Sequence, residues 1–247
     1  MAIGHDILSQ RGRPLRVIAH QCLGFNAKPN SAAALHAALE SSVDEVELDF
    51  RLSRDGSLVA AHLPWYRSAD GRLHRVAAVT ASSAREHGLL TLADALTMVS
   101  KDASHKRLRL EVKSTGAEEI VLSAVQSHGL SERVTIVSWH SDSLRRLRSV
   151  DSHIRLGYSF LIGCQGGGRV PLCFPRALPA LLKDNPVPVN SVNIVPSLFS
   201  PTPAFIADVR GCGVEVLLVT SYVLWSRRQV EALAVDGVVT SDPGAFR

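Results

Sequence analysis

Short apolar runs of strand length recur along the chain, and between them apolar residues return every three or four positions, as on one face of a helix. The strands that this pattern predicts are RVIAH (16–20), EVELDF (45–50), SLVAAH (57–62), LRLEVK (108–113), VTIVSW (134–139), IRLGYSF (154–160), SVNIV (191–195), VEVLLVTS (214–221) and DGVVT (236–240). Helices are predicted between them, the first with Ser31 as N-cap, another with Thr91 as N-cap and a third ending at Gly129. Strands that alternate with helices in this way are typical of parallel βα units.

Eight or nine strands with short intervening helices in 247 residues favour a closed sheet. We predict a single domain over residues 1–247 with an irregular (β/α)8 TIM-type barrel, and not a doubly wound sheet, because no GxGxxG opens the first helix. The segment RDGS (54–57) leaves no room for a helix, so the second and third predicted strands join in a hairpin-like connection. Residues 63–90 are polar and without clear period, which predicts an excursion over one end of the barrel after the third strand.

Composition narrows the class of protein. The chain is 46% hydrophobic, has a net charge of +4 and contains no signal-peptide pattern and no apolar run of membrane-spanning length, so we expect a soluble cytoplasmic protein without a membrane span. The four cysteines lie far apart with no CxxC pair, which favours free thiols over a disulfide scaffold or structural zinc site. The basic cluster at 145–148 is more typical of a solvated helix face than of a nucleic-acid-binding stripe, so no nucleic-acid partner is expected.

Two predicted strands carry carboxylates on alternate positions. In EVELDFR the period of two places Glu47, Asp49 and Arg51 on one face, and in LRLEVKS it places Glu111 and Lys113 together. Such a face can belong to an exposed edge strand, but inside a closed barrel acidic side chains need a cation. The three carboxylates would then reach the C-terminal mouth, where hard oxygen ligands suit Mg²⁺ or Ca²⁺.

Two histidines end predicted strands. His20 is the last residue of RVIAH, and His62 is the last residue of SLVAAH. A single histidine in this position is more often a hydrogen-bonded core residue. Two of them flanking a carboxylate cluster fit a general acid and a general base.

These segments together resemble the glycerophosphodiester phosphodiesterase family, a group of phospholipase-C-like TIM-barrel phosphodiesterases. The matching motifs are AHQC (19–22), ELDFRLSRDG (47–56), DGSLVAAH (55–62), EVK (111–113) and, more weakly, TSDP (240–243). The resemblance implies a barrel with an excursion after the third strand, and one divalent cation, Mg²⁺ or Ca²⁺ with Mn²⁺ as a further candidate. It also implies cleavage of a phosphodiester that has a small polyol or sugar on at least one side.

The same resemblance implies a role for each matching residue. The metal ligands are then Glu47, Asp49 and Glu111, and the catalytic acid and base are His20 and His62. Lys113 is the implied partner of a phosphate oxygen. The attacking oxygen can be a hydroxyl of the substrate itself, which gives a cyclic phosphate first, or it can be water.

The chain departs from the family pattern around the substrate. Gln21 stands where the family has arginine, so that HQC replaces HRG and a bidentate cation becomes a neutral amide. Either Arg51 or Lys28 could supply the missing charge. The family's PEN segment reads KPNS (28–31), which keeps Asn30, and Trp139 stands at the end of a strand where it can form part of the pocket wall. We therefore place Gln21, Arg51 and Trp139 beside Lys113 as substrate-binding residues.

The function predicted from the sequence is metal-dependent hydrolysis of a small soluble phosphodiester, a glycerophosphodiester or a sugar phosphodiester of the agrocinopine kind. One alternative is a lipid phosphodiesterase resembling sphingomyelinase D or lysophospholipase D, which needs an exposed apolar lip; the sequence offers the scattered candidates Trp65, Tyr66 and Trp225. Another alternative is a catalytically silent barrel that binds a sugar phosphate, favoured by the lost arginine and opposed by the retained histidines and carboxylates. The oligomeric state stays open.

Overall fold

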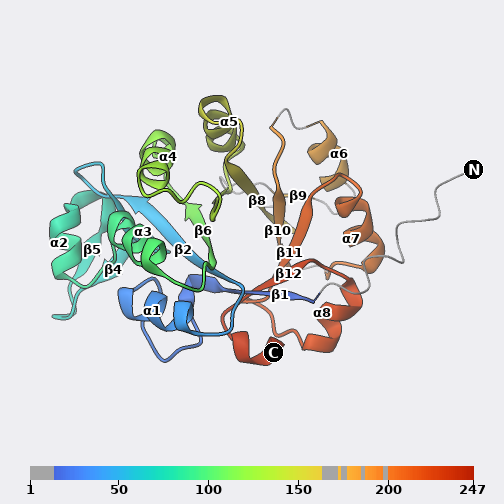
Figure 1. The fold of residues 1–247 in the computed structure, drawn as a ribbon, viewed down its shortest axis with the longest axis horizontal. Helices are drawn as coiled ribbons and strands as arrows, with labels where there is room; N and C mark the ends of the chain where they lie inside the picture. The colour runs from blue at the N-terminus through green and yellow to red at the C-terminus, as the bar shows by residue number, and fades with distance from the viewer. Residues whose placement is uncertain (1–13, 163–171, 174–176, 185–186, 197–199) are drawn as a thin grey trace, which may run out of the picture.

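Eight parallel strands close into a barrel in the computed structural model, which describes residues 14–162, 172–173, 177–184, 187–196 and 200–247 (Figure 1). In the order of their pairing, the barrel strands are β1 (Arg16–Ala19), β2 (Glu45–Leu52), β6 (Arg107–Val112), β7 (Val134–Ser138), β8 (Arg155–Ile162), β10 (Ser191–Pro196), β11 (Glu215–Val219) and β12 (Gly237–Thr240). Parallel pairing of β1 with both β2 and β12 closes the ring. The predicted TIM-type barrel is confirmed.

Helices surround this barrel on its outer side (Figure 1). They are α1 (Ala32–Glu40), α3 (Leu92–Lys101), α4 (Glu118–Ser127), α5 (Ser141–Val150), α6 (Leu178–Lys183), α7 (Pro203–Arg210) and α8 (Arg227–Leu233). The predicted N-caps are confirmed, because the side chain of Ser31 accepts from the N–H of Ala34, and Thr91 accepts from Asp94. Gly129 follows α4 with φ 66°, the left-handed conformation expected of a glycine just after a helix.

The third predicted strand is not a barrel strand. β3 (Leu58–Ala60) pairs antiparallel with the outer end of β2, so that Leu58 lies opposite Leu52 and Ala60 opposite Phe50. The hairpin-like connection through residues 54–57 is thus confirmed, whereas the assignment of this segment to the barrel is corrected. β2 is long enough to extend past the barrel rim, and the hairpin turns back from there. A short strand, β9 (Leu172–Cys173), pairs with β8.

The segment between β3 and α3 has regular structure of its own. It contains the antiparallel pair β4 (Trp65–Arg67) and β5 (Leu73–Arg75), the 3-10 turn η2 (Val76–Ala78) and the helix α2 (Ala81–Glu86). A small apolar cluster that includes Val59, Val76 and Leu89 lies beneath it. No period was visible in the sequence here because three-residue strands are too short to show one.

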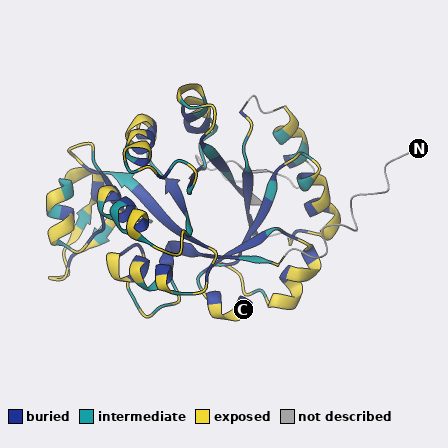
Figure 2. Ribbon diagram, in the orientation of Figure 1, coloured by how far each residue is buried: buried dark blue, intermediate teal, exposed yellow. Residues whose placement is uncertain are grey.

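Alternate residues of the barrel strands face opposite environments. On β2, Val46, Leu48 and Phe50 are fully buried beneath the helices, as the period of two predicted. Figure 2 shows the strands buried and the outer sides of the helices exposed. The inward positions of the barrel form a separate apolar cluster on one side and carry the charged residues of β2 and β6 on the other.

In the described part of the chain, no helix has the length and apolar character that a bilayer span requires. Cys22 and Cys212 are free thiols, as predicted, whereas Cys164 and the side chain of Cys173 lie outside what the structure describes.

Candidate active site

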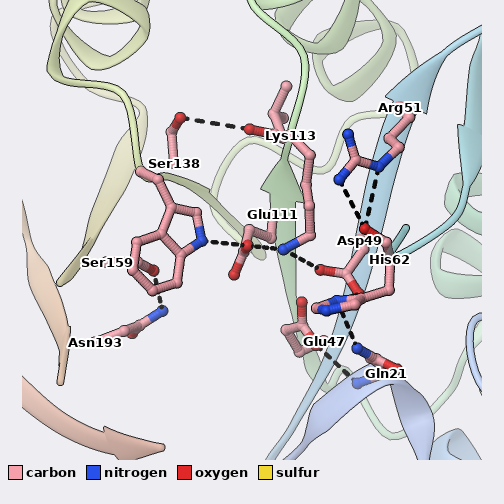
Figure 3. A network of polar contacts seen from close by, with 12 residues as sticks. Gln21, Glu47, Asp49, Arg51, His62, Glu111, Lys113, Ser138, Ser159 and Asn193 are labelled. Atoms are coloured by element: carbon pink, nitrogen blue, oxygen red, sulfur yellow. Dashed lines mark hydrogen bonds and ion pairs between the residues drawn. The ribbon is translucent and has the colours of Figure 1, made fainter. Parts of the chain in front are cut away.

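Three carboxylates converge at the C-terminal mouth of the barrel. β2 and β6 are parallel neighbours, and their register places Asp49 directly beside Glu111, with Glu47 one inward position earlier on β2. All three side chains are buried, and one oxygen of each lies within 4.8 Å of the others. Figure 3 shows them pointing toward one another from adjacent strands.

Glu47 is the carboxylate that most needs a cation. One of its oxygens accepts a hydrogen bond from the backbone N–H of Gln21 at 2.7 Å, and within the described residues its Oε1 is buried without a partner. Burial, together with repulsion from Asp49 and Glu111, raises the pKa of Glu47 well above its ordinary value. An all-oxygen donor set with an orphaned buried oxygen fits a hard divalent cation. The triad can therefore hold a metal ion.

Lys113 lies between two of these carboxylates. Its Nζ is 2.9 Å from Oδ1 of Asp49 and forms an ion pair with Oε1 of Glu111. Burial disfavours the charge on Asp49, but Lys113 and the hydrogen bond from His62 outweigh it and hold the pKa of Asp49 well below its usual range. Burial likewise opposes the charge on Lys113, and the two carboxylates outweigh it and raise its pKa. Lys113 is thus cationic at neutral pH at the predicted phosphate position.

Asn30 holds Asp49 in place from the loop after β1. Its side-chain amide donates to Oδ2 of Asp49 at 3.1 Å and accepts from the backbone N–H of Asp49 at 3.0 Å. Asn30 has φ 56°, a left-handed conformation that asparagine tolerates better than most residues. The asparagine retained in KPNS therefore has a structural reason, which the sequence alone did not supply.

His62 reaches the mouth through the hairpin. Because β3 runs back toward the barrel, His62 lies near Asp49, and its Nδ1 is 3.0 Å from Oδ2 of that residue. A carboxylate can only accept, so this contact places the proton on Nδ1 and leaves Nε2 as the basic nitrogen. Arg51 fixes the backbone here, since its Nε and Nη2 donate to the carbonyl of His62 at 3.1 and 2.8 Å.

His20 lies in the 3-10 turn η1 (His20–Cys22) directly after β1. Its ring centroid is 6.3 Å from that of His62 with an interplanar angle of 81°, and its Nδ1 is 3.3 Å from Oγ of Ser241 in the TSDP segment. Burial lowers the pKa of His20, although Asp49 and Glu111 oppose this shift. The two predicted catalytic histidines therefore face one another above the carboxylates.

Gln21 lies between the two histidines. Its amide nitrogen is 2.8 Å from Nδ1 of His62 and 3.5 Å from Nε2 of His20. A protonated Nδ1 cannot accept, so when His62 donates to Asp49 the amide must present its oxygen to that ring. Gln21 is 8% exposed and has φ 54°, and its side-chain amide lies against both histidine rings.

Of the remaining predicted substrate-binding and charge-supplying residues, some lie at the site and one does not. Trp139 donates from Nε1 to Oε1 of Glu111 at 2.6 Å, so it holds a carboxylate as well as forming the wall. Arg51 lines the pocket, while Lys28 is exposed and lies outside its lining. Of the two candidates for the missing charge, the structure thus brings only Arg51 to the site.

These residues line a cavity of about 1290 Å³ at the barrel mouth. Its lining also includes residues that the sequence did not single out, among them Ser159, Asn193 and Tyr222. The ring of Tyr222 is 6.1 Å from that of His20 in an edge-to-face arrangement. Each comes from a different strand or loop, and no motif marks any of them. Only the polar residues inside apolar runs at 159 and 193 could have signalled a site.

Comparison with known proteins bears on this geometry. No protein-family model matches the chain. A glycerophosphodiester phosphodiesterase of Caldanaerobacter subterraneus subsp. tengcongensis is 25% identical over 249 residues, which covers 92% of this chain and 94% of the relative. The structure of a glycerophosphodiester phosphodiesterase from Thermotoga maritima has a TM-score of 0.70 at 19% identity, covering 94% of this chain and 96% of that one.

A phosphodiesterase of Oleispira antarctica, solved in complex with the product sn-glycerol-3-phosphate, has a TM-score of 0.69 at 21% identity and covers 94% of each chain. The solved structures share the barrel fold. The curated relative bears out the family resemblance that the motifs indicated.

Proposed function

We propose that this chain is a phosphoric diester hydrolase of the glycerophosphodiester phosphodiesterase family, acting on a small soluble phosphodiester. The main support for this proposal is one observation. Two imidazole rings with centroids 6.3 Å apart share a cavity with three carboxylates whose oxygens converge within 4.8 Å. Acid–base groups beside a cation site can together catalyse hydrolysis of a phosphodiester.

Glu47, Asp49 and Glu111 would hold a single divalent cation, Mg²⁺ or Ca²⁺, and Mn²⁺ also suits these oxygen donors. When bound, the ion supplies positive charge that polarises the phosphoryl oxygens and offsets the negative charge of the phosphodiester. Lys113 lies beside the triad and can bind a phosphoryl oxygen through an N–H not used in its ion pairs.

The two histidines take the proton-transfer steps. Asp49 fixes the tautomer of His62, so its Nε2 can remove the proton from the attacking hydroxyl or water. His20, across the ring pair, must be in its protonated form to donate a proton to the leaving oxygen; burial, which lowers the pKa of His20, opposes that form, and Asp49 and Glu111 favour it. General acid–base catalysis of this kind contributes roughly 10²–10⁴-fold in rate per group.

The substrate has a polyol or sugar on at least one side in this proposal. The product sn-glycerol-3-phosphate in the Oleispira antarctica structure supports a glycerophosphodiester. Gln21 in place of arginine and Trp139 on the wall alter the phosphate and alcohol surroundings while the histidines and carboxylates are kept. A sugar phosphodiester of the agrocinopine kind fits that combination.

A lipid phosphodiesterase is a second candidate because of the rim of the mouth. Leu63, Tyr222 and Val223 line the cavity with exposed side chains, and the neighbouring Leu224 is fully exposed. This rim differs from the one that the sequence suggested, since Trp225 packs against the main core. An apolar rim of this kind suits an acyl chain beside the phosphate.

The test measures release of phosphomonoester from glycerophosphodiesters, sugar phosphodiesters and lysophospholipids, each with Mg²⁺, Ca²⁺, Mn²⁺ or EDTA. Metal-dependent turnover of a soluble diester is the expected result. Faster turnover of lysophospholipids would favour the second candidate. Silence across the panel, with tight binding of a sugar phosphate, would overturn hydrolysis and leave a binding barrel.

A further inference from the structure

A buried arginine crosses the barrel interior beneath the cavity. Arg109 of β6 is 1% exposed, and its Nη2 donates to Oγ of Ser191 at 2.8 Å and to Oδ1 of Asn193 at 3.2 Å on β10. Its Nη1 lies 3.4 Å from the carboxylate of Glu45. A Cβ at position 157 would lie 3.0 Å from Arg109 Nη2, so only glycine at this position avoids a close contact with the guanidinium. A fully buried charge is costly unless paired, and these contacts pair it.

This arginine determines which way the amide of Asn193 faces. A guanidinium has only donors, so the amide oxygen must face Arg109 and the amide nitrogen must face away from it. That nitrogen donates to Oγ of Ser159 on β8 at 3.2 Å (Figure 3). Among the described residues, no acceptor receives the hydroxyl proton of Ser159. Ser159 and Asn193 both line the cavity.

We propose that Ser159 and Asn193 form a subsite for a free hydroxyl oxygen on the alcohol side of the substrate, with Arg109 as its positioning residue. The inference rests on the proposed function, because it places the phosphate at the carboxylates of β2 and β6. In the order of the sheet, β7 separates β6 from β8, and β10 lies one strand further. The subsite therefore recognises a part of the substrate distinct from the phosphate.

The subsite presents one donor to the cavity, the hydroxyl of Ser159, which is 1% exposed beside the 5% exposed Asn193. The Ser159 oxygen accepts a hydrogen bond from Asn193. The hydroxyl proton of Ser159 is therefore directed toward a different acceptor. A polyol or sugar hydroxyl supplies that acceptor, whereas a choline group or an alkyl carbon does not. Buried polar groups left unpaired by the wrong substrate discriminate strongly against it. The inferred substrate class is a phosphodiester whose alcohol carries at least one further hydroxyl.

A pair of substrates that differ by one hydroxyl tests the inference. Diesters of propane-1,2-diol, esterified at its primary oxygen so that one hydroxyl stays free, and of propan-1-ol, with the same second alcohol, are compared by kcat and KM. We expect the unaltered enzyme to prefer the propane-1,2-diol diester by about tenfold or more in kcat/KM. Ser159→Ala should bring the ratio close to one, mainly by raising KM for the propane-1,2-diol diester. The control Ser143→Ala, which removes a buried hydroxyl bonded to Glu118 between α4 and α5, should keep the ratio.

Asn193→Asp distinguishes the positioning of the Ser159 hydroxyl from an effect on protein stability. The substitution is isosteric and keeps an acceptor for Arg109, but it removes the N–H donor, so the Ser159 hydroxyl turns to the new carboxylate and away from the substrate. We expect the hydroxyl preference to be lost while the unfolding midpoint is kept. Arg109→Lys should reduce the preference as well, because an ammonium lacks the fork that reaches both Ser191 and Asn193. A preference unchanged in Ser159→Ala and Asn193→Asp would overturn the subsite.

Measuring the binding of phosphomonoesters tests the hydroxyl preference without requiring turnover. Calorimetry with propane-1,2-diol 1-phosphate and propyl phosphate should show the same preference in the unaltered protein and its loss in Ser159→Ala. If no diester is hydrolysed, the proposed function fails, and the calorimetric preference still decides the subsite. Equal affinity for both monoesters in the unaltered protein would overturn it.

Discussion

The barrel interior has two unlike halves. On β2 and β6 the inward side chains are ionic: Glu45, Glu47, Asp49, Arg109 and Glu111. On the opposite side, β1, β10, β11 and β12 contribute an apolar cluster of Ile18, Val195, Leu217, Val219 and Val239. Ser191 and Asn193, earlier on β10, belong with the polar side, because both accept hydrogen bonds from Arg109. Both halves are buried and follow the same strand period, so residue type alone distinguishes them.

The difference shows that one closed sheet can place its reactive polar residues on one side and its stabilising apolar residues on the other. In the ionic half, burial is tolerated because charges are paired, as Lys113 is with Asp49 and Arg16 with Glu45. In the apolar half, Leu217 packs against its apolar neighbours, of which Val195, Val219 and Val239 also line the cavity. Changes in the ionic half should therefore alter activity, and changes in the apolar half should alter stability.

Removal of the cation should have the largest effect. EDTA should reduce phosphodiester hydrolysis to background, because the cation charge would no longer offset the phosphodiester at Glu47, Asp49 and Glu111. Added Mg²⁺ or Ca²⁺ should restore turnover, and the ion should raise the unfolding midpoint of the unaltered protein more than that of Glu47→Gln. Turnover that is indifferent to EDTA would show that the triad holds no essential metal.

Loss of either histidine should have the next largest effect. His20→Ala and His62→Ala should each lower kcat by about 10²–10⁴-fold, because each removes one proton-transfer group. The fold should survive, which unfolding midpoints will report. His36→Ala, on the exposed face of α1, is the matched control and should keep full activity. A variant with unchanged turnover would take that histidine out of the mechanism.

Leu217→Ala tests the apolar half. Leu217 is fully buried in the barrel interior, and its truncation should lower the free energy of unfolding by about 2–5 kcal/mol. We expect kcat to change less than about tenfold, since a stability change is separate from loss of an acid–base group. Urea unfolding and steady-state kinetics on one preparation measure both. Loss of activity matching that of His62→Ala, with stability intact, would contradict the division into halves.

Gln21→Arg should have the smallest effect, and it tests whether Gln21, beside the ionic half, determines the preference among diesters. An arginine would add a bidentate cation beside the phosphate, and should change the order of preference among diesters by about tenfold in kcat/KM. Gln21→Met, which removes the amide without adding charge, separates the gained cation from the lost contact with His62. If the ranking of diesters is the same in all three proteins, Gln21 does not determine the preference.

Local rules explain what the sequence determined by itself. The period of two along EVELDFR and LRLEVKS predicted which side chains point inward, and serine and threonine N-caps predicted where helices begin. Such patterns depend on neighbours a few residues apart, so they can be read without the fold. The barrel fold was predicted from these patterns, and only that predicted barrel placed Glu47 and Asp49 at the same mouth as Glu111.

Only the tertiary structure decided which distant residues meet. The antiparallel return of β3, and not a barrel position, brings His62 to Asp49. Likewise Arg51 donates to the carbonyl of His62 and Trp139 donates to Glu111, and Arg109 orients Asn193 across the barrel. These contacts join segments up to 84 residues apart, and side-chain direction across a closed sheet depends on register and shear, which no local pattern encodes.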